Sequence, residues 1–168
     1  MYMYDFVAVL IFDEETNIKI ISLKSLLESY GVKPTGKLPP HITIDLYENI
    51  DAEMLIATLN QFATNIKAFS FQFAEIGNFD NKVLFLRPDN IADFQNIKVL
   101  FDTYLGEYRI KNNANQGIYR PHLTLTSSED ITSSQTILEN NFTPFDGNVA
   151  QICVYSKNKE LIKRYDLK

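Results

Sequence analysis

The chain has 168 residues, of which 45% are hydrophobic and 12% aromatic, with only six glycines and six prolines. This composition excludes a disordered or fibrous protein and fits one globular domain. The formal net charge is −5, so the protein has no general attraction for long nucleic acid duplexes or anionic membranes. A small phosphorylated ligand stays compatible with this charge, because it needs only a few local donors.

The N-terminal residues predict a buried strand and no targeting segment. Residues 2–12 are rich in β-branched and aromatic side chains, but Asp5 interrupts the run, Asp13 ends it, and no basic segment precedes it. We therefore expect neither a signal peptide nor a membrane span. Cys153, the only cysteine, lies in an apolar run, which predicts a buried structural thiol. Together these features favour a cytoplasmic location.

The first half of the chain predicts alternating strands and helices. After the first strand, residues 14–30 repeat apolar side chains with a helical period and end at Gly31. The loop "VKPTGKLPP" leads into an alternating strand, "HITIDLY", at 41–47. Asp51 is expected to cap a helix of about 15 residues. The segments "FSFQFAEIGNF" and "VLFLRP" then predict a hairpin.

The second half repeats this order. Residues 90–107 carry a regular helical stripe, a strand begins at His122, a helix is expected within "SSEDITSSQTILENN", and the last two strands fall in "FTPFDGNVAQICVYS" and "ELIKRYDL". Strand, helix, strand, strand thus occurs twice, at about 41–87 and 122–167, which predicts an internal duplication. We expect an α+β fold over 1–168, a single bilobal domain of two antiparallel sheets with outer helices, related by a pseudo-twofold axis.

The only two histidines of the chain lie in the same short phrase, "PPHITI" and "RPHLTL", once in each repeat. Each is followed two residues later by a threonine, so His41 is paired with Thr43 and His122 with Thr124. Side chains at i and i+2 of a strand share a face, while the intervening apolar residues face the core. The duplication is therefore expected to place two imidazole–hydroxyl pairs across a cleft.

Two such pairs suit phosphodiester chemistry without a metal or cofactor. In-line displacement at phosphorus requires a base that deprotonates the attacking oxygen and an acid that protonates the leaving oxygen. Two histidines with an ordinary pKa of about 6.5 can share these roles at neutral pH. The two threonine hydroxyls can donate hydrogen bonds to the phosphate oxygens as negative charge develops there.

The two "H-hydrophobic-T-hydrophobic" phrases, in a duplicated α+β chain of this size, resemble the 2H phosphoesterase superfamily, which includes bacterial RNA 2′,5′-ligases and 2′,3′-cyclic phosphodiesterases. The resemblance spans most of the chain and implies the bilobal LigT-like fold with a central groove. It also implies a phosphodiesterase acting on 2′,3′-cyclic or 2′,5′-linked nucleotide or RNA-end phosphates. His41 and His122 match the catalytic histidines of the family, and Thr43 and Thr124 match its phosphate-binding hydroxyls.

The basic residue that many RNA-ligase-like relatives carry after the second phrase is missing here, where residues 126–129 are Thr, Ser, Ser and Glu. We expect Arg120 and Lys37, on the loops that enter the two histidine strands, to supply positive charge instead. Tyr119 is expected to stack on a base, as aromatic side chains do with single-stranded nucleotides. The predicted partner is a small nucleotide or an RNA end.

Three alternatives stay open at this stage. A binding module could recognise nucleotides or RNA ends in the same groove without turnover, although a binder does not need two titrating groups. A protein-interaction surface with incidental histidines is the second, and no feature of the sequence recommends it. A metal site is the third: it would need carboxylates beside the histidines, and Asp45, which strict alternation places on the His41 face, is the single candidate. We predict no metal.

Overall fold

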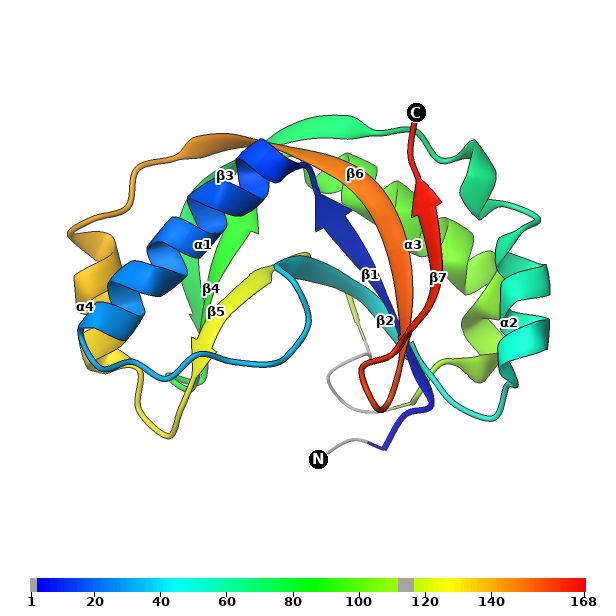
Figure 1. Ribbon diagram of the computed structural model, residues 1–168, viewed down its shortest axis with the longest axis horizontal. Coiled ribbons are helices and arrows are strands. Elements are labelled where there is room, and N and C mark those ends of the chain that lie inside the picture. The colour runs from blue at the N-terminus through cyan, green and yellow to red at the C-terminus, as the bar shows by residue number, and fades with distance from the viewer. Residues whose placement is uncertain (1–2, 112–116) are drawn as a thin grey trace.

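The computed structural model describes residues 3–111 and 117–168, and it has the alternating strands and helices that the sequence predicts (Figure 1). The strands are β1 (Phe6–Phe12), β2 (His41–Tyr47), β3 (Phe69–Phe79), β4 (Val83–Pro88), β5 (Leu123–Ser127), β6 (Phe145–Ser156) and β7 (Leu161–Asp166). The α-helices are α1 (Glu14–Ser29), α2 (Ala52–Leu59), α3 (Ile91–Leu105) and α4 (Thr132–Glu139). Short 3₁₀ turns, η1 (Ala63–Asn65) and η2 (Gly106–Tyr108), follow α2 and α3.

Helix α2 is shorter than the sequence predicts. Asp51 caps it as expected, since its carboxylate accepts a hydrogen bond of 2.8 Å from the backbone N–H of Met54. The helix nevertheless ends at Leu59. The next residue, Asn60, is a weak helix former, and its side-chain oxygen accepts a hydrogen bond of 2.7 Å from the phenol of Tyr165 in β7. This contact fixes Asn60 as the end of the helix, and the chain turns toward β3.

All seven strands form one antiparallel sheet, in the order β2-β1-β6-β3-β4-β5, with β7 paired to β6. Strand β6 joins the two halves. Its first residues pair with β3, and the rest of the strand lies between β1 and β7. The two sheets expected from the sequence are therefore halves of one continuous sheet, which curves so that each half forms a lobe (Figure 1).

The element order also reads as β-α-β-α-β twice, from β1 to β3 and from β4 to β6. The third strands are exchanged, because β6 pairs with β1 and β3 pairs with β4. The units expected from the sequence begin one strand and one helix later, at the histidine phrases. In either division β2 and β5 occupy equivalent edges of the sheet. The two histidine strands therefore lie at the two ends of the strand order, where they contact each other.

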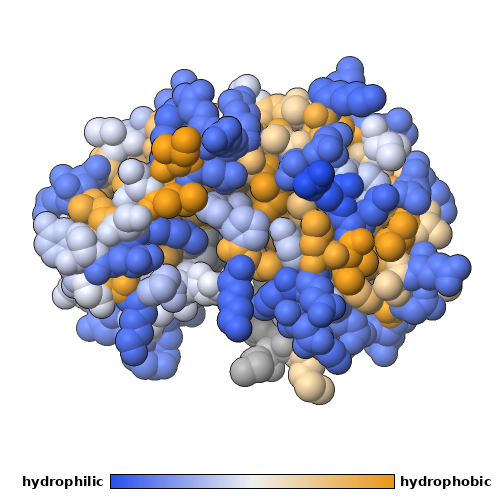
Figure 2. Space-filling view, viewed as in Figure 1, coloured by the Kyte–Doolittle hydropathy of each residue, from blue (hydrophilic) through white to orange (hydrophobic). Residues whose placement is uncertain are grey.

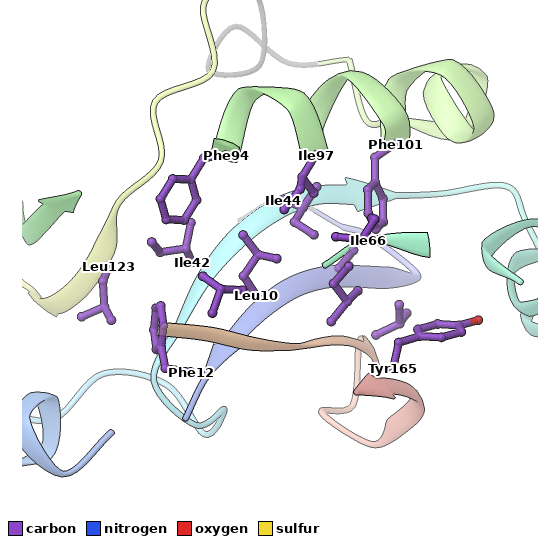
Figure 3. Packing of buried hydrophobic residues seen from close by; sticks show 14 of the residues in the cluster. Leu10, Phe12, Ile42, Ile44, Ile66, Phe94, Ile97, Phe101, Leu123 and Tyr165 are labelled. Atoms are coloured by element: carbon purple, nitrogen blue, oxygen red, sulfur yellow. The ribbon is translucent and has the colours of Figure 1, made fainter. Parts of the chain in front are cut away.

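The helices cover the outer face of the sheet, α1 and α4 on one lobe and α2 and α3 on the other (Figure 1). In Figure 3, side chains of α3 that include Phe94, Ile97 and Phe101 point toward the buried side chains of Ile42 and Ile44 in β2. This packing fixes one face of β2 against the core and leaves the other face to the histidine. Among the described residues, no helix combines the length and the apolar character that crossing a membrane would require.

The inner face of β1 and β6 carries a second, smaller apolar cluster. Its buried members are Val7, Val9, Ile11 and Cys153. Val9 pairs with both Thr43 and Cys153 across the sheet, so this cluster lies on the same face as the threonine of the first phrase. Burial raises the pKa of the Cys153 thiol to about 11, as befits an unreactive structural cysteine. His41 and Thr43 therefore lie beside this small apolar cluster.

Figure 2 shows the mixture of polar and apolar side chains that the molecule presents on the face seen in Figure 1.

Candidate active site

His41 and Thr43 lie on the inner face of the sheet, as the alternation of β2 predicts. His41 pairs with Ile11 of β1 and Thr43 pairs with Val9. Both side chains are half-buried, whereas Ile42 between them is fully buried on the helix side. The strand therefore presents an imidazole and a hydroxyl next to each other, beside the small apolar cluster of β1 and β6.

Asp45 lies on the other face, contrary to the expectation that it shares the His41 face. The register of β1 and β2 shifts between Val9, which pairs with Thr43, and Ala8, which pairs with Asp45. This bulge inserts one extra residue and reverses the alternation. The Asp45 carboxylate is buried against α3, where its oxygen lies 2.7 Å from the Lys98 ammonium. Asp45 therefore neither orients His41 nor joins it in a metal site.

His122 precedes β5 directly and is held by two phenylalanines of the β3–β4 hairpin. The ring centroids of His122 and Phe79 are 4.9 Å apart with an interplanar angle of 88°. The distance to the Phe85 centroid is 5.2 Å. Phe85 also pairs with Thr124 in the sheet. Edge-to-face packing of this kind orients a ring, so the hairpin fixes the second imidazole.

Each histidine strand is tied to the loop that precedes the other one. The phenol of Tyr119, just before the second phrase, donates a hydrogen bond of 2.6 Å to the carbonyl oxygen of Thr43. In the reverse direction, the Thr126 hydroxyl of β5 donates to the carbonyl of Lys33 at 3.2 Å, and the Thr35 hydroxyl donates to that of Leu125 at 3.4 Å. These reciprocal contacts hold β2 and β5 side by side.

Both imidazoles are held by the same hydrogen bond. Nδ1 of His41 lies 2.8 Å from the carbonyl oxygen of Pro39, and Nδ1 of His122 lies 2.8 Å from that of Arg120. A carbonyl oxygen only accepts, so each neutral ring carries its proton on Nδ1 and presents Nε2 as the acceptor. No other described residue hydrogen-bonds to either Nε2 or to the hydroxyls of Thr43 and Thr124. These four groups are free to meet a ligand.

The pKa of both histidines is lowered from the ordinary value. Burial is the main cause in each ring, and the backbone hydrogen bond to Nδ1 opposes it. The pKa of His41 is lowered further by the charges of Lys24, His122 and Lys159. A protonated His122 therefore favours a neutral His41. Coupling of this kind favours states in which at most one of the two rings is protonated.

A metal centre does not fit the side chains around the histidines. Among residues 3–111 and 117–168, no group of three or more His, Cys, Asp or Glu side chains is close enough to hold a metal ion. The free groups are instead two imidazole nitrogens and two hydroxyls. Such a set can exchange protons and donate hydrogen bonds to an anion.

Comparison with known proteins places the chain in a family. The model of the 2′-5′ RNA ligase superfamily matches residues 13–160, which include both histidine phrases. The chain belongs to this superfamily. A search of the curated proteins found no match. Membership supports a phosphodiesterase-type enzyme.

Three solved structures share the fold over nearly the whole chain. A phosphoesterase aligns with a TM-score of 0.68 at 16% identity, covering 99% of both chains. Escherichia coli LigT in complex with 3′-AMP also gives 0.68 at 16% identity and 98% coverage of both chains. The protein TT0787 of Thermus thermophilus gives 0.69 at 15% identity and 97% coverage of both. The expected LigT-like fold is therefore confirmed.

Two of the three predicted substrate-binding residues of this 2H phosphoesterase line a cavity together with His122, and the third does not. Tyr119, Arg120 and His122 line one cavity of about 310 Å³, and Arg120 is exposed there. Tyr119 is half-buried, and its phenol is engaged by Thr43. Lys37 is exposed in the loop before β2. A larger cavity of about 390 Å³ lies between α3 and the segment 61–69, which leads from the end of α2 into β3, and none of the predicted site residues lines it.

Sequence reasoning missed several residues that surround the site. Phe79 and Phe85 were assigned only to a hairpin, yet they contact His122. Lys24 of α1 and Lys159 of the β6–β7 turn act on His41 from segments far away in the chain. The alternation of β4 alone predicts that Phe85 and Arg87 share one face. It does not predict that His122 lies beside this face, because that depends on the pairing of β4 with β5.

Gly77 makes room for the ring of Phe85, which contacts His122, so Gly77→Ala should displace this histidine. An added Cβ would lie 2.5 Å from the Phe85 ring. The ring must then move, and we expect the free energy of unfolding to fall by about 1–3 kcal/mol and kcat/KM by roughly tenfold through the misplaced imidazole. Denaturant unfolding and hydrolysis assays measure the two effects. Gly106→Ala is the matched control, because its Cβ would meet nothing within 4 Å, and equal effects would contradict the assignment.

Tyr119→Phe separates the hydrogen bond of this residue from its ring. The variant leaves the Thr43 carbonyl without its donor, so we expect a loss of about 1 kcal/mol of stability and a roughly threefold to tenfold lower kcat with little change in KM. Tyr119→Leu removes the ring as well, and it should also raise KM if the ring stacks on a base. Tyr104→Phe on α3, a half-exposed tyrosine outside this cavity, is the control. An unchanged kcat in Tyr119→Phe would show that the contact with Thr43 does not position the site.

Proposed function

We propose that this protein is a metal-independent phosphodiesterase that acts on 2′,3′-cyclic or 2′,5′-linked phosphates of nucleotides or RNA ends. The observation that carries the proposal is the pair of free Nε2 atoms, each fixed by a backbone hydrogen bond at Nδ1 and each next to a free threonine hydroxyl. Superfamily membership supports the reaction class. A LigT structure that contains 3′-AMP supports a nucleotide-sized substrate.

In the proposed reaction the phosphate lies between β2 and β5. The neutral histidine removes a proton from water as the oxygen attacks phosphorus, and the protonated histidine donates its proton to the ribose oxygen that leaves on the opposite side. Thr43 and Thr124 donate hydrogen bonds to the non-bridging oxygens, where negative charge grows. The orientation of the substrate decides which of His41 and His122 acts first as base. The products are a phosphomonoester and a free ribose hydroxyl.

Three further residues are proposed to bind the substrate. Arg120 and Lys37 supply positive charge along the groove, in place of the basic residue that follows the second phrase in many relatives. The ring of Tyr119 lines the same cavity as Arg120, where it can contact a base or ribose.

The direct test is hydrolysis of the four nucleoside 2′,3′-cyclic monophosphates by the purified protein in EDTA. The double variant His41→Ala/His122→Ala serves as the blank. Turnover by the wild-type protein alone is the expected result, and the isomer of the product reports which ribose oxygen leaves. Binding of the nucleotides without turnover would favour the alternative of a binding module. A strong loss of activity with EDTA would contradict a metal-independent reaction.

The pH optimum of kcat/KM is expected on the acid side of about 6.5. The base must be neutral and is active above its pKa, whereas the acid must be protonated and is active below its pKa. Burial lowers the pKa of both imidazoles, so both limbs of the profile move to lower pH. Rates measured over a range of pH at constant ionic strength check this. An optimum well above the ordinary histidine pKa would contradict it.

A matched variant can assign the two limbs. Lys24 lowers the pKa of His41 through its charge but has no such effect on His122. Lys24→Gln should therefore move only the limb that belongs to His41, and it should move that limb to higher pH. If the rising limb moves, His41 is the base; if the falling limb moves, it is the acid.

A further inference from the structure

The cavity beside His122 is electropositive, although the protein as a whole carries a net charge of −5. Arg87 of β4 and Arg120 of the loop before β5 both line it, and no Asp or Glu is among the described residues that do. Arg87 follows Leu86, which pairs with Leu123, so Arg87 stands next to His122 in the register of the sheet. Two guanidinium groups therefore reach one recess from two different segments.

Both guanidinium groups are available to a ligand. Among the described residues, Arg87 forms an ion pair only with Glu75, at 3.4 Å, and both side chains of this pair are well exposed, so the pair is weak and easily exchanged. The guanidinium of Arg120 has no ion pair or hydrogen bond with any residue in the described part of the chain. Arginine is well suited to bind phosphate through two parallel hydrogen bonds.

These two arginines are placed to bind a charge other than that of the reacting phosphate. In the proposed reaction that phosphate contacts His41, Thr43 and Thr124 as well as His122, but of these four residues only His122 lines this cavity. The cavity therefore extends from His122 away from the reacting phosphate, and the two guanidinium groups line this extension. At about 310 Å³ the recess is at the small end of ligand sites, a size that suits one nucleoside unit.

We propose that Arg87 and Arg120 form an anion subsite that binds a second phosphate of the substrate, one nucleoside away from the phosphate that reacts. This inference rests on the proposed function and narrows its substrate class. The preferred substrate is a nucleotide or RNA end with a further phosphate on the 5′ side of the reacting ribose, rather than a simple nucleoside cyclic monophosphate. The exposed Ile118 and the ring of Phe79, which also line the cavity, provide apolar contacts for the nucleoside between the two phosphates.

The test compares two nucleotides that differ by one phosphate, in a binding assay that does not depend on turnover. Adenosine 3′,5′-bisphosphate is expected to bind about tenfold more tightly than adenosine 3′-monophosphate, and this difference should shrink as the salt concentration rises. Calorimetry measures both dissociation constants. Equal constants in the wild-type protein would overturn the subsite.

Variants assign the difference to the two arginines. Arg87→Gln/Arg120→Gln should reduce the tenfold difference to less than about twofold, whereas Lys82→Gln should leave it unchanged. Lys82 is a matched control because it is an exposed cation of the same hairpin, paired with Glu129 and outside the cavity. Glu75→Gln frees Arg87 and should increase the difference. Retention of the full difference in the double variant would also overturn the proposal.

A third ligand identifies the source of the second phosphate. An adenosine dinucleotide with a 3′-terminal phosphate carries a diester, not a monoester, on the 5′ side. If it gains as much affinity as the bisphosphate, the subsite takes the internal phosphate of an RNA end; if it gains none, the subsite takes a terminal monoester. Hydrolysis of cyclic monophosphates with no effect of a 5′-phosphate would remove the subsite and leave the proposed function standing. Absence of both binding and hydrolysis would remove the proposed function itself.

Discussion

Replacing either histidine by alanine is expected to lower kcat/KM for nucleoside 2′,3′-cyclic phosphates by roughly 10²- to 10⁴-fold. In the proposed reaction each imidazole performs one of two proton transfers, and no other described residue hydrogen-bonds to its Nε2. Because the two rings act as a unit, His41→Ala/His122→Ala should be little worse than the poorer single variant. Initial rates in EDTA, with wild-type protein at low concentration as the reference, measure these losses.

A structural cause can be separated from this chemical one. His41 and His122 are half-buried at the edges of the sheet, so their truncation should leave the fold intact, and circular dichroism and thermal unfolding check this. Thr103→Ala, at an exposed helix position of α3, is a control for handling and purity. A folded double variant that turns over at the wild-type rate would exclude the two-histidine mechanism and leave the activity to another part of the chain.

The features that could be predicted from the sequence are those determined within one strand or one helix. Alternation along β2 and β5 placed His41 with Thr43 and His122 with Thr124, and each pair lies on one face in the structure. The helical periods likewise predicted α1 and α3 to within two residues at each end. Local periodicity carries this information because each residue contributes a fixed rotation or translation to its element.

The features that could not be predicted depend on pairing between distant segments. Asp45 changed face because β1 imposes a bulge on β2, and no pattern within β2 alone shows where its partner shifts register. The charges of Lys24 and Lys159 reach His41 only through the packing of α1 and the β6–β7 turn around the groove. The same holds for Arg87, whose neighbour His122 is set by the pairing of β4 with β5. These residues surround the proposed site, whereas the predicted ones are the groups that we propose to carry its chemistry.

Asp45→Ala is expected to lower the free energy of unfolding by about 2–4 kcal/mol. Asp45 is only 4% exposed, and its carboxylate lies 2.7 Å from the Lys98 ammonium, with the Arg109 guanidinium 3.9 Å away. Removal of the carboxylate leaves the Lys98 charge largely out of water, with Asp102 as its remaining partner. Because Asp102 remains as a partner, the expected loss of stability is smaller than the full cost of breaking a buried ion pair. Denaturant unfolding measures the loss, and Glu129→Ala, which breaks the exposed pair with Lys82, should cause no measurable change.

The double variant Asp45→Leu/Lys98→Met should recover at least half of the loss, because apolar side chains of similar size avoid the buried unpaired charge. The same variants decide what Asp45 does for the reaction. Its carboxylate faces α3 and is separated from His41 by the thickness of the sheet, so well below the melting temperature kcat/KM should stay within about threefold of the wild type. A catalytic or metal-binding carboxylate would instead cost activity at every temperature, and the double variant would not restore it. Stability loss without activity loss therefore assigns Asp45 to the anchoring of β2 on α3, and the opposite result would return it to the site.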